Sequence, residues 1–176
     1  MDGVFTSYPK CWLEFIEART GKHFNSLEEA KKILSYANYV DLKNDYRSSE
    51  FKYNLTPSEG SSVFTNFLKE QGWFVVLATT RPASHPGLQT RTVRWLEKNG
   101  IYFDDLLFLN KELDILARYP DFIFGVQDDP EVCNILAKMG YRVFLIRNGR
   151  NFDNLHENVV LADTLEDIIR RVVNWT

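Results

Sequence analysis

The chain has 176 residues, of which 44% are hydrophobic and 26% charged, and its formal net charge is −3. These values predict one soluble globular domain with room for a small insertion. They exclude an overall basic field that would attract nucleic acid or an anionic membrane. The longest apolar runs, such as Phe74–Ala78, are far too short to cross a bilayer. Cys11 and Cys133 form no Cys-x-x-Cys unit, so we expect a reducing, cytoplasmic environment.

The segment from residue 8 to residue 55 is predicted to be helical. Pro9–Thr20 carries its apolar side chains at helical spacing, and Gly21 is a plausible end for that helix. Ser26–Glu29 has the form of a capping box, which starts a second helix. Val40–Asn54 is charged and only weakly periodic, so the pattern predicts no particular element there. No strand is predicted in this segment.

Beyond residue 56 the pattern alternates between helix and strand. The predicted strands are Trp73–Ala78, Leu106–Leu109, Phe122–Val126 and Tyr141–Ile146. The predicted helices are Glu59–Gln71, Thr90–Lys98, Lys111–Arg118, Pro130–Met139 and a last helix capped by Asp163–Glu166. Such alternation is typical of an α/β fold with a Rossmann-like parallel sheet. Binding sites of these sheets lie at the carboxyl ends of the strands, so the polar residues there are the candidates.

The first predicted strand is followed by Thr79, Thr80, Arg81 and Pro82. A hydroxyl and free backbone N–H groups directly after a buried strand can hold a phosphate oxygen. The guanidinium of Arg81 can add a bidentate contact to the same phosphate. The two threonines are equally compatible with a simple turn.

Charged residues follow the next two strands. Lys111 stands at the start of a predicted helix, where the helix dipole is already positive, so an anion in front of it would explain its place. A solvated surface lysine is the alternative. Asp128 and Asp129 follow the third strand, and paired carboxylates are hard oxygen ligands that suit Mg²⁺. The alternative for this pair is an N-cap of the following helix.

Taken in chain order, these strand ends resemble the haloacid dehalogenase-like (HAD) superfamily of phosphohydrolases. Met1-Asp2-Gly3-Val4 looks like the second half of the Asp-x-Asp-Gly motif that opens such enzymes. Thr79 matches the family's second motif and Lys111 its third, while Asp128-Asp129-Pro130-Glu131-Val132 matches the fourth. The resemblance runs from Asp2 to the last predicted strand. Within the superfamily, the fourth motif is similar to that of 5′(3′)-deoxyribonucleotidases and of the phosphatase domain of polynucleotide kinase–phosphatases.

The resemblance implies a Mg²⁺-dependent phosphatase that hydrolyses a phosphomonoester through an aspartyl-phosphate. It implies catalytic roles for Asp2, Thr79 and Lys111, substrate binding by Thr80 and Arg81, and metal binding by Asp2, Asp128 and Asp129. Asp2 would be the general acid and base, and its backbone carbonyl would be the metal ligand. The implied substrate is a small phosphorylated molecule, with nucleotides or nucleic-acid ends favoured.

In this family a small helical cap is inserted between the first and second motifs, where it closes over the site. The resemblance therefore implies a core of residues 1–7 and 56–176 and a cap of residues 8–55. Two aromatic side chains of that segment, Trp12 and Tyr39, are candidates to stack on a base, although packing inside the cap is the simpler role for them.

The family's nucleophile is the first Asp of its opening motif, and that position would precede Met1. The apolar strand that carries it would also be missing from its place between the strands that end at Thr79 and Asp128, which would leave two strand edges unpaired. Our hypothesis is a longer chain that supplies both, so residues 1–176 alone are expected to have little phosphatase activity. The alternatives are a nucleophile-less relative that binds a phosphate or nucleotide, and an unrelated receiver-like domain, which would lack the cap-length insertion.

Overall fold

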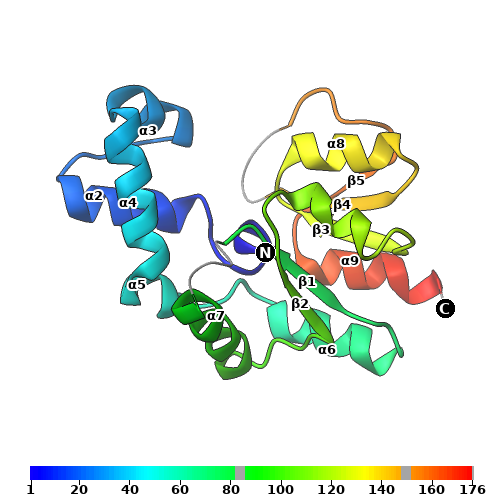
Figure 1. Cartoon of the computed structure of the whole chain (residues 1–176). Coiled ribbons are helices and arrows are strands. Elements are labelled where there is room, and N and C mark those ends of the chain that lie inside the picture. The colour runs from blue at the N-terminus through cyan, green and yellow to red at the C-terminus, as the bar shows by residue number, and fades with distance from the viewer. Residues whose placement is uncertain (82–85, 148–151, 176) are drawn as a thin grey trace.

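The computed structural model describes residues 1–81, 86–147 and 152–175. The α-helices are α1 (Asp2–Phe5), α2 (Lys10–Thr20), α3 (Leu27–Ile33), α4 (Tyr36–Ser48), α5 (Glu50–Tyr53), α6 (Ser61–Glu70), α7 (Pro86–Lys98), α8 (Pro130–Lys138) and α9 (Leu165–Val172). The strands are β1 (Val76–Thr79), β2 (Asp105–Phe108), β3 (Phe124–Gln127), β4 (Arg142–Ile146) and β5 (Val159–Ala162), and two 3₁₀ helices are η1 (Glu112–Ala117) and η2 (Val173–Trp175). Figure 1 shows α2 to α5 together at one end of the molecule, apart from the strands.

Helices α2 to α5, which we call the helical segment, have an apolar cluster of their own. Trp12 and Tyr46 lie fully buried in it, and their rings are 5.1 Å apart. Of the capping box predicted at Ser26–Glu29, the N-cap is confirmed, since the Ser26 hydroxyl accepts the N–H of Glu29 at 3.1 Å. The Glu29 carboxylate accepts the backbone N–H of Asn25 at 2.7 Å rather than that of Ser26. The stretch that the pattern left unassigned, Val40–Asn54, contains the end of α4 and all of α5. The side chain of Ser49 caps α5. Serine caps, which satisfy free N–H groups, therefore start the helices where apolar periodicity is weak.

The strands form a parallel α/β arrangement, as predicted, but in two separate pieces. β1 pairs with β2, and β4 pairs with β3 on one side and β5 on the other; every pair is parallel. The sequence patterns do not predict β5, a four-residue strand at the edge of its sheet. The predicted helix Lys111–Arg118 is a 3₁₀ helix over Glu112–Ala117 instead, and α7 begins four residues before the predicted Thr90.

β4 shows how the sheet separates two apolar clusters. Side chains alternate between the faces of a strand, and those of β4 are buried on both faces. Val143 and Leu145 pack in the cluster that includes α8, whereas Phe144 and Ile146 pack in the cluster that includes α6, α7 and α9. Helices on both faces explain why this strand reads as a continuous apolar run.

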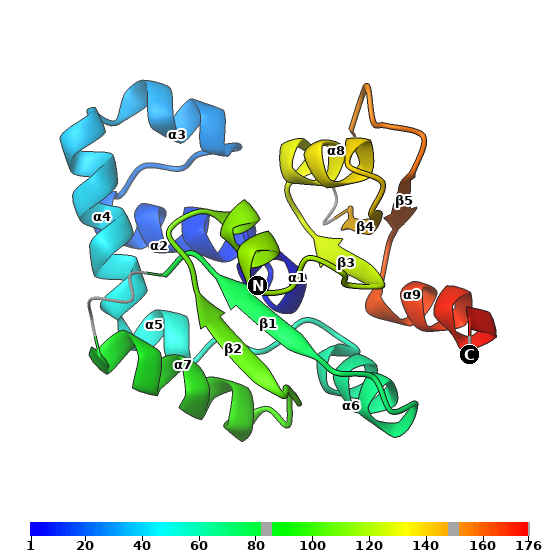
Figure 2. The same ribbon diagram turned by 45° about the vertical axis from the view of Figure 1, so that its right-hand side comes forward.

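A gap separates the two pieces of the sheet. Within the described ranges, β1 and β3 are each unpaired on the edge that faces the other, and α1 lies between them near their carboxyl ends (Figure 2). A cavity of about 690 Å³ opens there, lined by residues of both strands together with Val4, Phe5 and side chains of α6. Unpaired edges beside an apolar cavity are what a sheet without its middle strand leaves behind. The expected gap is therefore present.

In the part of the chain that the structure describes, no helix has both the length and the apolar character that crossing a membrane requires.

Candidate functional site

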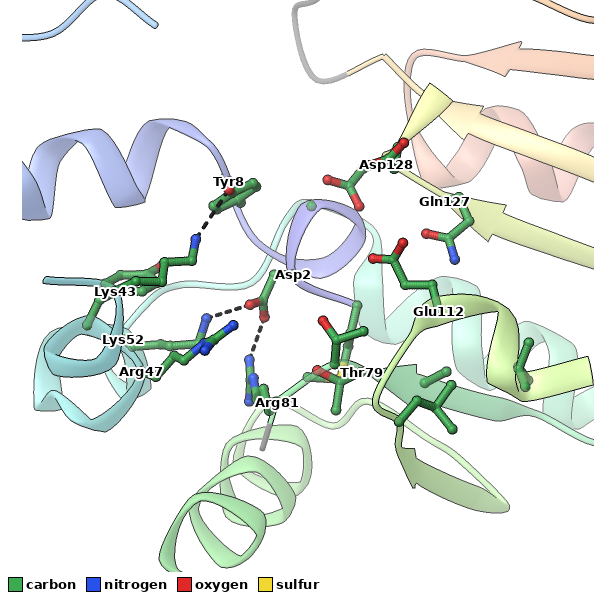
Figure 3. A pocket seen from close by; sticks show the side chains of 18 residues that line it. Asp2, Tyr8, Lys43, Arg47, Lys52, Thr79, Arg81, Glu112, Gln127 and Asp128 are labelled. Atoms are coloured by element: carbon green, nitrogen blue, oxygen red, sulfur yellow. Dashed lines mark hydrogen bonds and ion pairs between the residues drawn. The ribbon is translucent and has the colours of Figure 1, made fainter. Parts of the chain in front are cut away.

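A second pocket, of about 270 Å³, lies where the carboxyl ends of β1 and β3 face the helical segment. We call it the strand-end pocket. Figure 3 shows basic side chains of α4 and α5 on one side of it, acidic side chains that follow β2 and β3 on the other, and Asp2 between them. The two sides come from segments far apart in the sequence, so their opposite charges are a property of the fold.

Asp2 lies in the first turn of α1, and its carboxylate pairs with two basic side chains. Its Oδ2 accepts from Lys52 Nζ at 2.7 Å, and its Oδ1 accepts from Arg81 Nη2 at 2.5 Å. The basic side chains are only 2% and 5% exposed, against 33% for that of Asp2. Arg81 is held in place by a second hydrogen bond, from Nη1 to Thr92 Oγ1 at 2.6 Å. The carboxylate is therefore fixed in orientation on two sides.

These contacts decide the charge of Asp2. Burial alone would raise the pKa of this carboxyl, but the nearby charges of Lys52 and Arg81 outweigh it and hold the pKa well below its usual value. Burial also lowers the pKa of Lys52, and Asp2 opposes that shift. Asp2 is consequently an anion at neutral pH.

Gly3 brings α1 against the loop after β3. A methyl group at Gly3 would come within 1.8 Å of Asp128 Oδ2, so only a glycine allows this approach. The neighbouring Asp129 accepts the N–H groups of Glu131 at 2.8 Å and Val132 at 3.3 Å, which makes it the N-cap of α8. Asp129 thus caps α8, and Asp128 lies against the first turn of α1.

The acidic side of the pocket consists of Asp128, Asp129 and Glu112. Desolvation in the pocket wall, together with the charges of Asp129 and Asp128, raises the pKa of Glu112. Among the described residues, no group of three or more His, Cys, Asp or Glu side chains is close enough to hold a metal ion. The donors are nevertheless hard oxygens under mutual repulsion, and this chemistry fits Mg²⁺. Asp128 is a candidate ligand because its carboxylate lies against the first turn of α1, next to Asp2, and Asp129 lines the same pocket while it caps α8.

The structure brings most of the predicted site residues together. Thr79 is buried at the end of β1, and Thr80 borders the same pocket. Lys111 is exposed and does not line the pocket; its backbone N–H is bonded to Asp114 Oδ2 at 2.9 Å, and the next residue, Glu112, reaches the pocket instead. Pro82 lies outside the described residues.

Sequence reasoning missed the basic residues of the helical segment. Lys43, Arg47 and Lys52 line the pocket on the side away from the sheet. Burial, and next the charge of Lys52, lowers the pKa of Lys43 to about 8. No motif marks these residues, because their segment has weak helical periodicity. Trp12, a candidate for base stacking, is fully buried in the cluster of the helical segment, and Tyr8 and Tyr46 are the aromatic residues at the pocket.

The fold has close counterparts among solved structures, although no family model and no curated protein sequence matches the chain. A predicted phosphatase from Clostridium acetobutylicum superposes with a TM-score of 0.63 at 13% identity, over 96% of this chain and 91% of the other. A HAD hydrolase of family IA, variant 3, from Entamoeba histolytica HM-1:IMSS gives 0.62 at 16% identity, over 99% and 95%. A D,D-heptose 1,7-bisphosphate phosphatase from Burkholderia thailandensis gives 0.55 at 17% identity, over 69% and 88%. At these identities the likeness establishes the fold alone: the chain has the parallel α/β fold that these three structures share.

Proposed function

We propose that the strand-end pocket is the phosphate site of a Mg²⁺-dependent phosphatase that hydrolyses a phosphomonoester, with nucleotides or nucleic-acid ends favoured. The observation that carries the proposal is the arrangement around Asp2. Its carboxylate is fixed by the buried side chains of Lys52 and Arg81. It lies beside the end of β1 and faces the carboxylates that follow β3. Anion-binding and cation-binding groups thus meet in one pocket, as phosphoryl transfer requires.

Each group has a role in this proposal. As an anion, Asp2 can act as the base that activates water; to protonate the leaving oxygen as general acid it would first have to take up a proton, which the charges of Lys52 and Arg81 oppose. Thr79 and adjacent backbone N–H groups hold the phosphoryl oxygens, with Thr80 and Arg81 binding the substrate. Asp128, with Asp129 in support, would hold Mg²⁺, which would neutralise the negative charge between carboxylate and phosphate. The backbone carbonyl of Asp2, a metal ligand by the resemblance, accepts from Thr6 N at 2.9 Å and Thr6 Oγ1 at 2.6 Å, and would have to give up one of these bonds to reach the metal. Lys111 would need to turn towards the pocket to take the part that the resemblance implies.

The gap between β1 and β3 supports a further element of this proposal. An apolar strand parallel to both would satisfy the two unpaired edges and fill the cavity of about 690 Å³. Its carboxyl end would reach α1, where an aspartate one residue ahead of Met1 would stand two positions before Asp2. We propose that the nucleophile is carried there, and that residues 8–55 form the cap over the site.

A designed extension tests this directly. About six apolar residues of high β-propensity followed by an Asp are placed immediately before Met1. We expect the extended chain to release phosphate from p-nitrophenyl phosphate with Mg²⁺, and to unfold at a higher denaturant concentration than residues 1–176. The matched control is the same extension ending in Asn, which should gain the stability without the turnover.

The outcomes separate the candidate functions. Turnover in the Asp extension that is lost on Asp128→Ala supports the phosphatase. Turnover by residues 1–176 alone that disappears with Asp128→Ala would contradict a nucleophile carried on the added strand. An extended chain that is stabilised and binds phosphate, but does not hydrolyse the ester, would favour the second candidate, a phosphate- or nucleotide-binding relative. The pairing of Asp2 with Lys52 and Arg81 supports this second candidate.

A further inference from the structure

We propose that the strand-end pocket has a second anion subsite, formed by Lys43 and Arg47 of α4, and that the substrate is a phosphomonoester whose leaving group carries a carboxylate or phosphate of its own. This inference rests on the proposed function, since it assumes that the transferring phosphoryl group binds beside Asp2 and Thr79. It adds what the other end of the substrate must be.

One side of the pocket carries an excess of positive charge. Lys43, Arg47, Lys52 and Arg81 all line it there, and the carboxylate on that side is Asp2. Asp2 is already bound by Lys52 and Arg81. Neutralising a single phosphoryl group does not require the two basic residues that remain, because Mg²⁺ and the backbone N–H groups after β1 would serve that end of the pocket. Lys43 and Arg47 are therefore available to another anion.

Lys43 is surrounded by aromatic side chains and has no carboxylate partner among the described residues. Its Nζ lies 3.2 Å from Tyr8 Oη, and 4.5 Å and 4.7 Å from the ring centres of Tyr8 and Trp12. Across the described residues, neither Lys43 nor Arg47 has a carboxylate within ion-pair distance. The rings attract the ammonium but do not neutralise its charge. Its partial burial without a carboxylate partner is unfavourable, and a bound anion would lower that cost.

The positions of Lys43 and Arg47 suit an anion at one end of the pocket. Lys43 and Arg47 are four residues apart on α4, so their side chains project from the same face of the helix. In Figure 3 they stand across Asp2 from Asp128, at the end of the pocket opposite the acidic side. A pocket of about 270 Å³ holds only a compact molecule, which narrows the proposed substrates from nucleotides and nucleic-acid ends to small phosphomonoesters. A small substrate with an anion at each end would span it, and hydrolysis of the P–O bond would leave the second anion on the product alcohol.

The test compares two probes that differ by one carboxylate. Binding of phenyl phosphate and of 4-carboxyphenyl phosphate to residues 1–176 is measured by calorimetry at pH 7 with Mg²⁺. We expect the carboxylated probe to bind about tenfold more tightly, which is the effect of one charge-assisted contact. In Lys43→Gln the ratio of the two affinities should fall towards one. Lys43→Arg keeps the charge, so it should retain most of the tenfold preference for the carboxylated probe. Lys32→Gln, on the exposed surface of α3, is the matched control and should retain the wild-type ratio.

Each outcome has a distinct meaning. If phenyl phosphate binds and the added carboxylate brings no gain, the second subsite is wrong and the proposed function stands. If the gain persists in both Lys43→Gln and Arg47→Gln, the carboxylate is bound elsewhere and the inference is overturned. If neither probe binds, the phosphate site itself fails, and the proposed function with it. A thermal melt of each variant checks that it is folded, so that a lost preference for the carboxylated probe is not caused by unfolding.

Discussion

The α-carbon of Gly3 lies against the carboxylate of Asp128, so close that a methyl group there would come within 1.8 Å of Oδ2 and 2.6 Å of Cβ. The contact joins the first turn of the chain to the loop after β3, across the mouth of the gap in the sheet. It sets the separation between Asp2 and the candidate metal ligand, because the two aspartates are carried by the two segments that meet at this glycine.

Gly3→Ala should therefore destabilise the protein. The short side chain of Asp128 cannot move aside without moving its backbone, so we expect a loss of about 1–3 kcal/mol in the free energy of unfolding, typical of overpacking. Urea denaturation measures it. Gly87→Ala in α7 is the control, since nothing lies within 4 Å of the added methyl group, and it should leave stability unchanged or slightly raised. Equal unfolding midpoints for the two variants would contradict the contact.

Removal of the ammonium of Lys52 tests the pairing of Asp2. Lys52→Met keeps the length of the side chain but takes away one of two charged partners, so we expect a loss of about 1–3 kcal/mol in unfolding free energy. The pKa of Asp2 should rise at the same time, because Lys52 is the main charge that lowers it. Lys10→Met, whose side chain is 79% exposed and 4.0 Å from Glu14, should change stability by less than about 0.5 kcal/mol.

The second anion subsite should weaken in alkaline solution. The ionisable side chains that shape the pKa of Lys43 are Asp2, Cys11, Arg47 and Lys52. Because that pKa is about 8, below the ordinary value for lysine, the ammonium is present below this pH and is lost above it. The advantage of 4-carboxyphenyl phosphate should thus be full at pH 7 and decline above pH 8, whereas the carboxylate of the probe stays ionised throughout. Calorimetry across this range measures the decline.

The variant Lys43→Arg gives the control for this pH dependence. A guanidinium keeps its proton over the whole range, so the advantage of the carboxylated probe should persist at pH 9. An equal decline in the wild type and in Lys43→Arg would assign the pH dependence to another group.

The thiols should be unreactive in the folded protein. Cys11 and Cys133 have no exposed surface, and burial, followed by the charges of Asp129 and Asp128, raises the pKa of Cys133 to about 12. Since the thiolate is the reactive form, a chromogenic disulfide at pH 8 should label neither cysteine rapidly in native protein and both in denaturant. Rapid labelling of one thiol without denaturant would show that the apolar cluster around it opens readily.

The sequence by itself determined the α/β arrangement and the place of the candidate site. Strands buried on both faces need continuous apolar runs, and β4 shows this plainly, with Val143 and Leu145 on one face and Phe144 and Ile146 on the other. Parallel strands gather their carboxyl ends at one edge, so Thr79 and Asp128 could be expected at one pocket, where the structure has them. The gap between β1 and β3 was expected only through the resemblance to the HAD superfamily, whose opening motif follows a strand that lies between these two.

Only the tertiary structure decided which charged side chains share that pocket. Lys52 and Arg81 meet Asp2 from 50 and 79 residues away, and no local spacing encodes such a contact. The basic face of α4 depends on the packing of the helical segment around Trp12 and Tyr46. Apolar periodicity is weak in these helices, so capping serines and aromatic contacts determine that packing. Lys111, by contrast, has the residue type and the position that the motif requires, yet it is exposed, because a 3₁₀ helix begins directly after it and Glu112 takes the place at the pocket. Strand ends follow from local hydrophobic pattern, whereas the direction in which a charged side chain points follows from the packing of the whole chain.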